Sequence, residues 1–238
     1  MIRVAAAGDL HFGPDSTGTL RPALAVLAAR ADALLLAGDL TKTGTPAEAE
    51  ALAAELSAAP VPVVAVLGNH DHHSDRAGDV RATLEGVGVT VLDGEATVLE
   101  LDGARVGVVG AKGFGGGFIG ASASEFGEPE MKAFVRRTKE DAERIRRGLG
   151  ELEGRVDLRV ALLHYAPVRD TLQGEPPELF PFLGSSLLAE AVDGAGADLV
   201  LHGHAHRGTE KGATPGGVKV RNVAQPVLGR AYRVYRFS

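Results

Sequence analysis

The sequence predicts an α/β fold, and two observations carry this prediction. Short apolar runs alternate along the chain with longer stretches of helical periodicity, which is typical of α/β proteins. Apolar residues make up 45% of the 238 residues and charged residues 24%, as in a folded globular protein with a sizeable core. At about 150 residues per domain the length allows one or two domains, and because a single α/β domain of this size is ordinary, we expect one domain over residues 1–238.

The apolar runs are expected to form strands because they are short and end at glycine or polar residues. They lie at Arg3–Ala7, Ala33–Ala37, Pro62–Leu67, Val89–Leu92, Thr97–Leu101, Arg105–Val109, Leu158–Leu163, Asp198–Leu201, Val218–Val223 and Tyr232–Phe237. The helical stretches are Leu20–Arg30, Pro46–Ala58, Asp79–Gly86, Pro129–Leu149 and Ser186–Val192. The second of these helices has a clear start, with Thr45 as the N-cap, Pro46 at the first helical position and Glu48 at the third.

Two long loops have unusual compositions. Residues 110–127 contain seven glycines, and residues 165–184 contain four prolines. Structureless loops of this length are uncommon in compact domains and are often functional. We therefore expect the segments 113–120 and 166–182 to select the substrate.

Composition excludes several classes of function. The net charge of −6 and the pI of about 5.8 give no electrostatic footprint for nucleic acid or an anionic membrane. The absence of cysteine excludes disulfides, thiolate zinc sites and cysteine nucleophiles. No apolar run approaches the roughly 20 residues that span a bilayer, and the N-terminus lacks a secretory leader. A cytoplasmic protein with a small-molecule partner is expected, and the oligomeric state is left open, a homodimer included.

The placement of the histidines is the most informative feature of the sequence. All eight follow or end an apolar run, and none is expected inside a helix. In four places a glycine ending such a run directly precedes an Asp, Asn or His, as in Gly8-Asp9, Gly38-Asp39, Gly68-Asn69 and Gly203-His204. Glycine permits a positive φ and close packing, so we expect the chain to turn sharply there. The residue that follows then projects at the carboxyl end of its strand, where open α/β sheets bind ligands.

Two carboxylates, one amide and at least four imidazoles would meet at this edge of the fold. That donor set is too rich for one cation, whereas two ions about 3.5–4 Å apart would use it fully. Oxygen and nitrogen donors without sulfur suit Mn, Fe, Co or Zn, and the residues do not choose among them. We therefore expect two divalent or mixed-valence transition metal ions.

The five segments together resemble the calcineurin-like metallophosphoesterase superfamily. The resemblance rests on Asp9-Leu10-His11, Gly38-Asp39, Gly68-Asn69-His70-Asp71, His164 and Gly203-His204-Ala205-His206, in the order typical of that superfamily. It covers residues 8–206. It implies a four-layer α/β/β/α sandwich of two mixed β-sheets flanked by helices. It also implies hydrolysis of a phosphate ester by a hydroxide that bridges the two ions.

The resemblance also assigns roles to single residues. The first metal ion would be held by Asp9, His11, Asp39 and His206. The second would be held by Asp39, Asn69, His164 and His204, with Asp39 bridging. His70 would be catalytic, protonating the leaving oxygen, and it would contact the substrate together with Asn69. Asp71 would complete the catalytic set by orienting or polarising the segment.

Comparison with branches of the superfamily narrows the expected substrate. Protein Ser/Thr phosphatases have a longer second motif and Glu in place of Asp71, and lipid A precursor hydrolases have Arg in place of His70. Small bacterial phosphodiesterases, including those acting on cyclic nucleotides, are closest in size and motif. We therefore expect a phosphodiesterase. The alternatives are a phosphomonoesterase or protein phosphatase using the same site, and a non-catalytic protein-binding scaffold like one retromer subunit.

Other histidines and motifs receive a structural interpretation. His202 lies on the apolar alternation of its strand and is expected to be buried, whereas His72 and His73 are expected in an exposed turn. Gly115–Gly120 matches the dinucleotide pattern G-x-G-x-x-G but neither follows its strand directly nor opens a helix, so we expect a mobile loop over the site instead. Residues 70–73 resemble the H-x-H-x-D-H of metallo-β-lactamases but lack its Asp-His pair.

Overall fold

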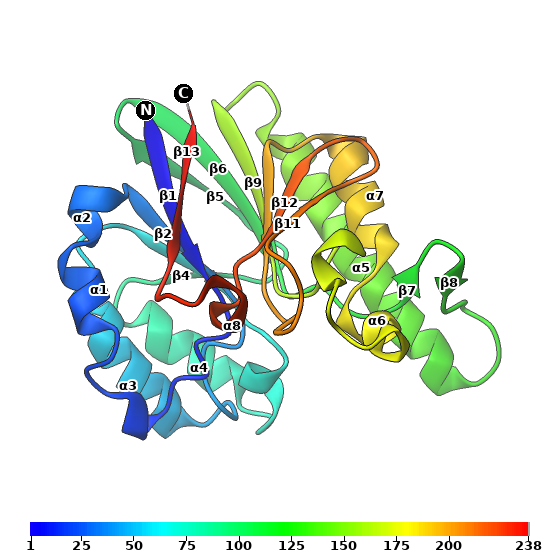
Figure 1. Ribbon diagram of the computed structural model, residues 1–238, viewed down its shortest axis with the longest axis horizontal. Helices are drawn as coiled ribbons and strands as arrows, with labels where there is room; N and C mark the ends of the chain where they lie inside the picture. Colours follow the sequence, from blue (N-terminus) through cyan, green and yellow to red (C-terminus); the bar gives the residue numbers. More distant parts are fainter. Residues whose placement is uncertain (238) are drawn as a thin grey trace.

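The computed structural model, which describes residues 1–237, has two mixed β-sheets packed face to face with helices on both outer faces (Figure 1). This is the four-layer α/β/β/α arrangement that the resemblance implies. Among residues 1–237 no helix combines the length and apolar character needed to cross a membrane.

The first sheet contains five strands in the order β13-β1-β2-β3-β4. Their bounds are β1 (Ile2–Ala7), β2 (Ala33–Ala37), β3 (Val63–Val66), β4 (Thr90–Leu92) and β13 (Arg233–Phe237). Strands β1 to β4 run parallel to their neighbours, and only β13 is antiparallel, at the edge beside β1.

The second sheet contains six strands in the order β11-β12-β10-β9-β6-β5. Their bounds are β5 (Ala96–Leu101), β6 (Ala104–Ala111), β9 (Leu158–Leu163), β10 (Leu199–His202), β11 (Lys211–Ala213) and β12 (Lys219–Asn222). The four central strands are parallel and both edge strands are antiparallel. A separate hairpin, β7 (Gly117–Phe118) and β8 (Ala121–Ser122), lies within the glycine-rich loop.

The helices divide between the two outer faces. Beside the first sheet lie α1 (Arg21–Ala25), α2 (Leu27–Arg30), α3 (Pro46–Leu56) and α4 (Ala77–Glu85); beside the second lie α5 (Pro129–Leu152) and α7 (Ser186–Ala195) (Figure 1). Two further short helices are α6 (Phe180–Leu183) and α8 (Gln225–Leu228), and single 3₁₀ turns occur at Pro14–Ser16, His70–His72, Asp170–Leu172 and Pro177–Leu179.

Alternation along the central strands explains why these runs are apolar throughout. In β2, Leu34 and Leu36 pack against the helices of the first sheet, whereas Leu35 and Ala37 pack against the second sheet. Successive side chains of a strand point to opposite faces, so a strand buried on both faces has no polar position. The apolar runs therefore fix the inner layers of the sandwich.

All ten predicted strands and all five predicted helical segments are present, with end shifts of up to three residues. The segment 20–30 is not one helix, because the backbone of Val26 leaves helical geometry and separates α1 from α2. The expectation that no histidine lies in a helix is wrong for His70 and His72, which belong to one 3₁₀ turn.

Candidate metal centre

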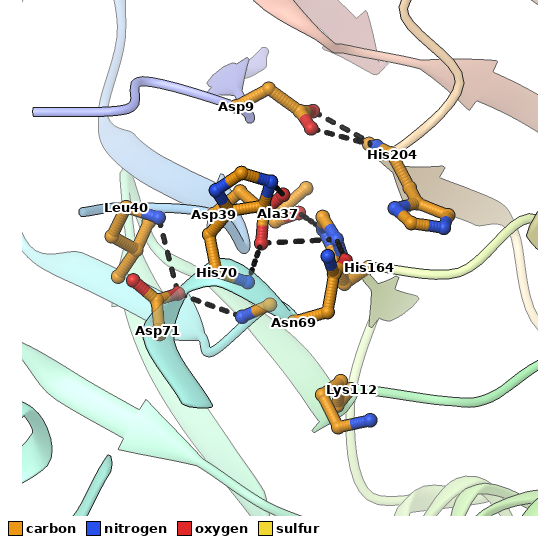
Figure 2. Close-up of polar contacts among 12 residues, drawn as sticks. Asp9, Ala37, Asp39, Leu40, Asn69, His70, Asp71, Lys112, His164 and His204 are labelled. Atoms are coloured by element: carbon orange, nitrogen blue, oxygen red, sulfur yellow. Dashed lines mark hydrogen bonds and ion pairs between the residues drawn. The ribbon is translucent and has the colours of Figure 1, made fainter. Parts of the chain in front are cut away.

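The predicted ligands meet at the carboxyl ends of five strands (Figure 2). Asp9 and His11 follow β1, Asp39 follows β2, and Asn69 follows β3 in the first sheet. The second sheet supplies His164 after β9 and His204 and His206 after β10. Potential ligand atoms form two groups, each within 4.8 Å: Asp9, His11, Asp39 and His206 in one, and Asp39, His164 and His204 in the other.

Asp39 belongs to both groups, and its two carboxylate oxygens face different partners. Oδ1 lies 3.3 Å from His164 Nε2 in the second group. Oδ2 lies 4.0 Å from His11 Nε2 in the first group. A carboxylate with this orientation can serve one cation on each side.

The remaining donors complete the two groups. In the first, His206 Nε2 lies 2.9 Å from Asp9 Oδ1 and 3.4 Å from His11 Nε2. In the second, the Asn69 amide oxygen lies 2.9 Å from His164 Nε2, which adds the predicted amide ligand. Imidazole nitrogens and carboxylate or amide oxygens without sulfur are suitable ligands for Mn, Fe, Co or Zn, so the residues present fit divalent transition metals.

Four of these residues have left-handed backbone conformations. The φ angles are 57° at Asp9, 43° at His11, 49° at Asp39 and 70° at His204. Such angles are uncommon outside glycine and cost about 1 kcal/mol or more each, and they concentrate at functional sites. The sequence predicts that the preceding glycines permit a positive φ and close packing. Among them, a positive φ is found only at Gly38, at 79°.

The predicted close packing is present at Gly68 and Gly203. A Cβ on Gly68 would lie 2.1 Å from Asp39 Oδ1, and one on Gly203 would lie 2.3 Å from Asp9 Oδ2. Each glycine thus lets the turn after one strand approach a carboxylate from another strand. In the Gly-Asn and Gly-His pairs, the glycine allows close contact between two turns, and the residue after it is a potential ligand.

Hydrogen bonds to the backbone orient two of the imidazoles. His164 Nδ1 donates to the carbonyl of Ala37 at 2.9 Å, which directs Nε2 toward Asp39 and Asn69. His204 Nε2 donates to the carbonyl of Phe182 at 3.3 Å, which leaves Nδ1 available. Histidine ligands of metals commonly use the second ring nitrogen in this way.

Two of the three charge states match what metal ligation requires, an ionised Asp39 and a neutral His204, whereas a protonated His164 would have to lose its proton when an ion binds. Burial raises the pKa of Asp39, but His164 lowers it more, so the pKa lies well below its usual range and the carboxylate is ionised. Burial lowers the pKa of His164, but Asp39 raises it more, to about 9. Burial lowers the pKa of His204 to about 3, so this imidazole is neutral at pH 7.

His70 lies beside the two groups without belonging to either. Its Nδ1 donates to the Lys42 carbonyl at 2.7 Å, and its backbone N–H donates to Asp39 Oδ1 at 2.8 Å. The other ring nitrogen, Nε2, lies 3.9 Å from Asp39 Oδ2 on a side chain that is 44% exposed. The ring is thus held in one orientation with one nitrogen turned toward solvent at the centre.

Asp71 lies behind the centre rather than in it (Figure 2). It is fully buried, and its carboxylate accepts hydrogen bonds from the backbone N–H groups of Gly68, Leu40 and Thr41 and from the Thr41 hydroxyl. Asp71 therefore ties the turn after β3 to the turn after β2. With all its bonds made inside the protein, it has no access to a substrate, which leaves orientation of the segment as its expected role.

Replacement of Asp71 should destabilise the protein. In Asp71→Ala, three backbone N–H groups lose their acceptor in a buried place, and each unsatisfied group costs about 1–3 kcal/mol. The free energy of unfolding, measured with urea, should fall by about 3 kcal/mol or more. The exposed Asp79→Ala, which breaks only a surface ion pair with Arg76, should lower it by less than about 1 kcal/mol. Equal effects of the two substitutions would contradict this role for Asp71.

The histidines assigned structural roles lie as expected. His202 is fully buried and its Nε2 is 2.8 Å from the Thr171 hydroxyl. His72 and His73 are exposed. The G-x-G-x-x-G segment contains β7 and the turn that leads to β8, and it opens no helix.

Three residues near the centre were missed by the sequence reasoning. Lys112 follows β6, Tyr165 follows the predicted ligand His164, and the Phe182 carbonyl accepts a hydrogen bond from His204, a contact that the prediction for segment 166–182 did not include. Burial lowers the pKa of Lys112 to about 8 and raises the pKa of Tyr165 to about 12. The available signal was position alone, since Lys112 directly follows β6 and Tyr165 lies two residues after the end of β9.

Comparisons with known proteins agree with this geometry. The sequence model of the calcineurin-like phosphoesterase family matches residues 2–208. No curated relative matches the sequence. Among solved structures, the phosphopantetheinyl hydrolase of Mycobacterium tuberculosis is similar, with 16% identity, a TM-score of 0.68 and coverage of 99% of this chain and 96% of that one.

Two further structures share the fold. Protein TT1561 of Thermus thermophilus has 19% identity and a TM-score of 0.55, with coverage of 99% of this chain and 98% of that one. GAP50, the anchor in the inner membrane complex of Plasmodium, has 12% identity and a TM-score of 0.57, with coverage of 94% and 72%. At these identities the structures establish the fold, whereas the family match spans the ligand turns themselves. The chain therefore belongs to the calcineurin-like phosphoesterase family and is a metal-dependent hydrolase of phosphate esters.

Proposed function

We propose that this protein is a dinuclear phosphodiesterase that hydrolyses a small phosphate diester, such as a cyclic nucleotide. The observation that carries the two-ion proposal is the position of Asp39, which is shared by two ligand groups and turns one carboxylate oxygen to each. Asp9, His11, Asp39 and His206 would hold the first ion, and Asp39, Asn69, His164 and His204 the second.

When bound, such ions activate water and neutralise charge on the phosphate. Around them, the protein supplies fixed donors. Backbone carbonyls hold the imidazoles of His164 and His204, and backbone N–H groups hold the carboxylates, such as that of His204, which donates to Asp9 at 3.0 Å. The ligand positions are thus set by the fold before substrate arrives.

His70 is the proposed general acid. Its Nδ1–H is committed to the Lys42 carbonyl, so only Nε2 can exchange a proton with a substrate. The hydrogen bond from its backbone N–H to Asp39 Oδ1 keeps Nε2 beside the shared carboxylate. Proton donation to the leaving oxygen from this place typically contributes about 10²–10⁴-fold in rate. Asn69, one residue earlier, would contact the substrate from the same turn, and Asp71 would position that turn from behind.

Diester hydrolysis should exceed monoester hydrolysis. The support is the motif comparison, in which Asp71 and His70 separate this chain from the protein-phosphatase and lipid A precursor branches. With Mn²⁺ supplied, kcat/KM should be higher for bis(p-nitrophenyl) phosphate than for p-nitrophenyl phosphate, two substrates with the same leaving group. A preference for the monoester would instead support the phosphomonoesterase alternative.

A wider panel tests the substrate class. It should include cyclic nucleotides and a phosphopantetheine diester, the latter because one structural neighbour is a phosphopantetheinyl hydrolase. Mn, Fe, Co and Zn should be supplied separately. Failure to bind any of these metals or to hydrolyse any aryl phosphate would favour the scaffold alternative, for which the fold of GAP50 is a precedent.

A further inference from the structure

Lys112 and Tyr165 lie beside the second ligand group, and the proposed reaction uses neither. The carbonyl of Lys112 accepts hydrogen bonds from the backbone N–H groups of His164 and Tyr165, both at 3.0 Å. Figure 2 shows Lys112 at the end of β6, below Asn69 and His164. Its backbone is thus fixed to the turn that carries a metal ligand.

Both side chains carry polar groups that the protein leaves largely unpartnered. Lys112 is 9% exposed and its ammonium makes one hydrogen bond, to the Gly113 carbonyl at 3.3 Å. Tyr165 is 7% exposed, and its hydroxyl makes no hydrogen bond within residues 1–237. An ammonium has three N–H donors, and a buried charge without partners is costly.

Asp141 on α5 is the acid whose charge most favours the protonated form of Lys112, but it makes no ion pair with it. Its Oδ1 lies 3.3 Å from Arg137 and 3.9 Å from Arg144 and accepts no hydrogen bond within the described residues. Within the described chain, Lys112 has no carboxylate oxygen within ion-pair distance. The positive charge of Lys112 is therefore available to a ligand.

Two aromatic rings position the Lys112 ammonium. The Lys112 ammonium lies 4.6 Å from the ring centroid of Phe114 and 5.0 Å from that of Tyr165. The Tyr165 ring in turn lies 4.3 Å from the His204 ring. Phe182, whose carbonyl accepts a hydrogen bond from His204, has a side chain that is 60% exposed. Cation–π contacts stabilise the ammonium without using its N–H groups, which stay free to donate.

We propose that Lys112 and Tyr165 form a substrate subsite, next to the second ligand group, that binds a second anionic group of the substrate. This group is a carboxylate or phosphate separate from the phosphate that is cleaved. The ammonium and the phenol hydroxyl donate to its oxygens, and hydrogen bonds between charged groups are the stronger kind. The inference rests on the proposed phosphodiesterase function, because it names which diesters the site prefers.

A matched pair of substrates tests the subsite. Ethyl p-nitrophenyl phosphate and 2-carboxyethyl p-nitrophenyl phosphate share the scissile bond and differ only in a carboxylate. With Mn²⁺, the wild-type protein should have a KM about tenfold lower for the carboxyethyl ester. The ratio of the two kcat/KM values should fall to about 1 in Lys112→Met. In Tyr165→Phe this ratio should lie between 1 and the wild-type value. In Lys112→Arg it should stay close to the wild-type value. Lys219→Met, at the far end of β12, is the matched control and should keep the wild-type ratio.

The outcomes separate this inference from the proposed function. The subsite is refuted, while diester hydrolysis stands, in two cases. In the first, the wild-type protein hydrolyses both esters with the same kcat/KM; in the second, Lys112→Met lowers kcat/KM for both esters by the same factor. A substrate with a second phosphate in place of the carboxylate shows which anion is preferred. If neither ester is hydrolysed, the proposed function fails, and the subsite is then tested by binding alone. In that case 2-carboxyethyl phosphate should raise the melting temperature of the protein with Mn²⁺ more than ethyl phosphate does, and Lys112→Met should abolish the difference; equal shifts would refute the subsite.

Discussion

Asp39→Asn is expected to lose metal binding and hydrolysis together, with kcat/KM falling by about 10³-fold or more. Each oxygen of Asp39 faces one ligand group, so the amide removes a ligand from one group and the negative charge from both. The fold itself should tolerate the change. Asparagine has nearly the same shape, and it also accepts the left-handed backbone found at this position.

Metal content measured by elemental analysis, alongside turnover of bis(p-nitrophenyl) phosphate, tests this expectation. Asp75→Asn is the matched control, because Asp75 is an exposed aspartate with a φ of 56°, close to the 49° of Asp39. The control should keep both metal and activity. An Asp39→Asn protein that retains full activity would rule out a shared carboxylate.

His70→Ala should keep the metal and slow hydrolysis by about 10²-fold or more. The ring contributes to neither ligand group, and its Nε2 is the nitrogen able to give a proton to the leaving oxygen. The loss should therefore depend on the leaving group. It should be large for an alkoxide, which must be protonated, and small for nitrophenolate, which leaves unprotonated.

Comparison of kcat for alkyl and nitrophenyl diesters, with metal content measured in parallel, separates this role from a structural one. His73→Ala changes an exposed histidine three residues along the same turn and should leave both rates unchanged. Equal losses for good and poor leaving groups would show that His70 acts in another way. A loss of metal would place His70 among the ligands.

The inner layers of the fold were predictable because they depend on local pattern. The strand formed by Ala33–Ala37 is buried on both faces, and its uninterrupted apolar run shows this in the sequence. The helix starting at Pro46 was predictable from its cap, since Thr45 and Glu48 form the reciprocal capping bonds that their spacing indicates. The break at Val26 has no such signal, because no glycine or proline marks it.

The candidate site was predictable only in part. The ligand turns follow recognisable strands, so Asp9, Asp39 and His204 were found from the sequence. Close packing was predicted for their glycines, but which turns they contact was not, because contacts between turns that are distant in the chain leave no local signal in the sequence. Lys112 was missed for the same reason: its isolation from carboxylates emerges only when β6, β9 and α5 are packed together.

Each ligand group draws on both sheets. Asp9, His11 and Asp39 from the first sheet meet His206 from the second, and Asp39 meets His164 and His204. A cation bound in either group would therefore cross-link the two sheets. In the first group it would connect residues that are 197 positions apart in the chain. Because such an ion binds only the assembled protein, its concentration would govern the resistance of the whole sandwich to heat and denaturant by mass action.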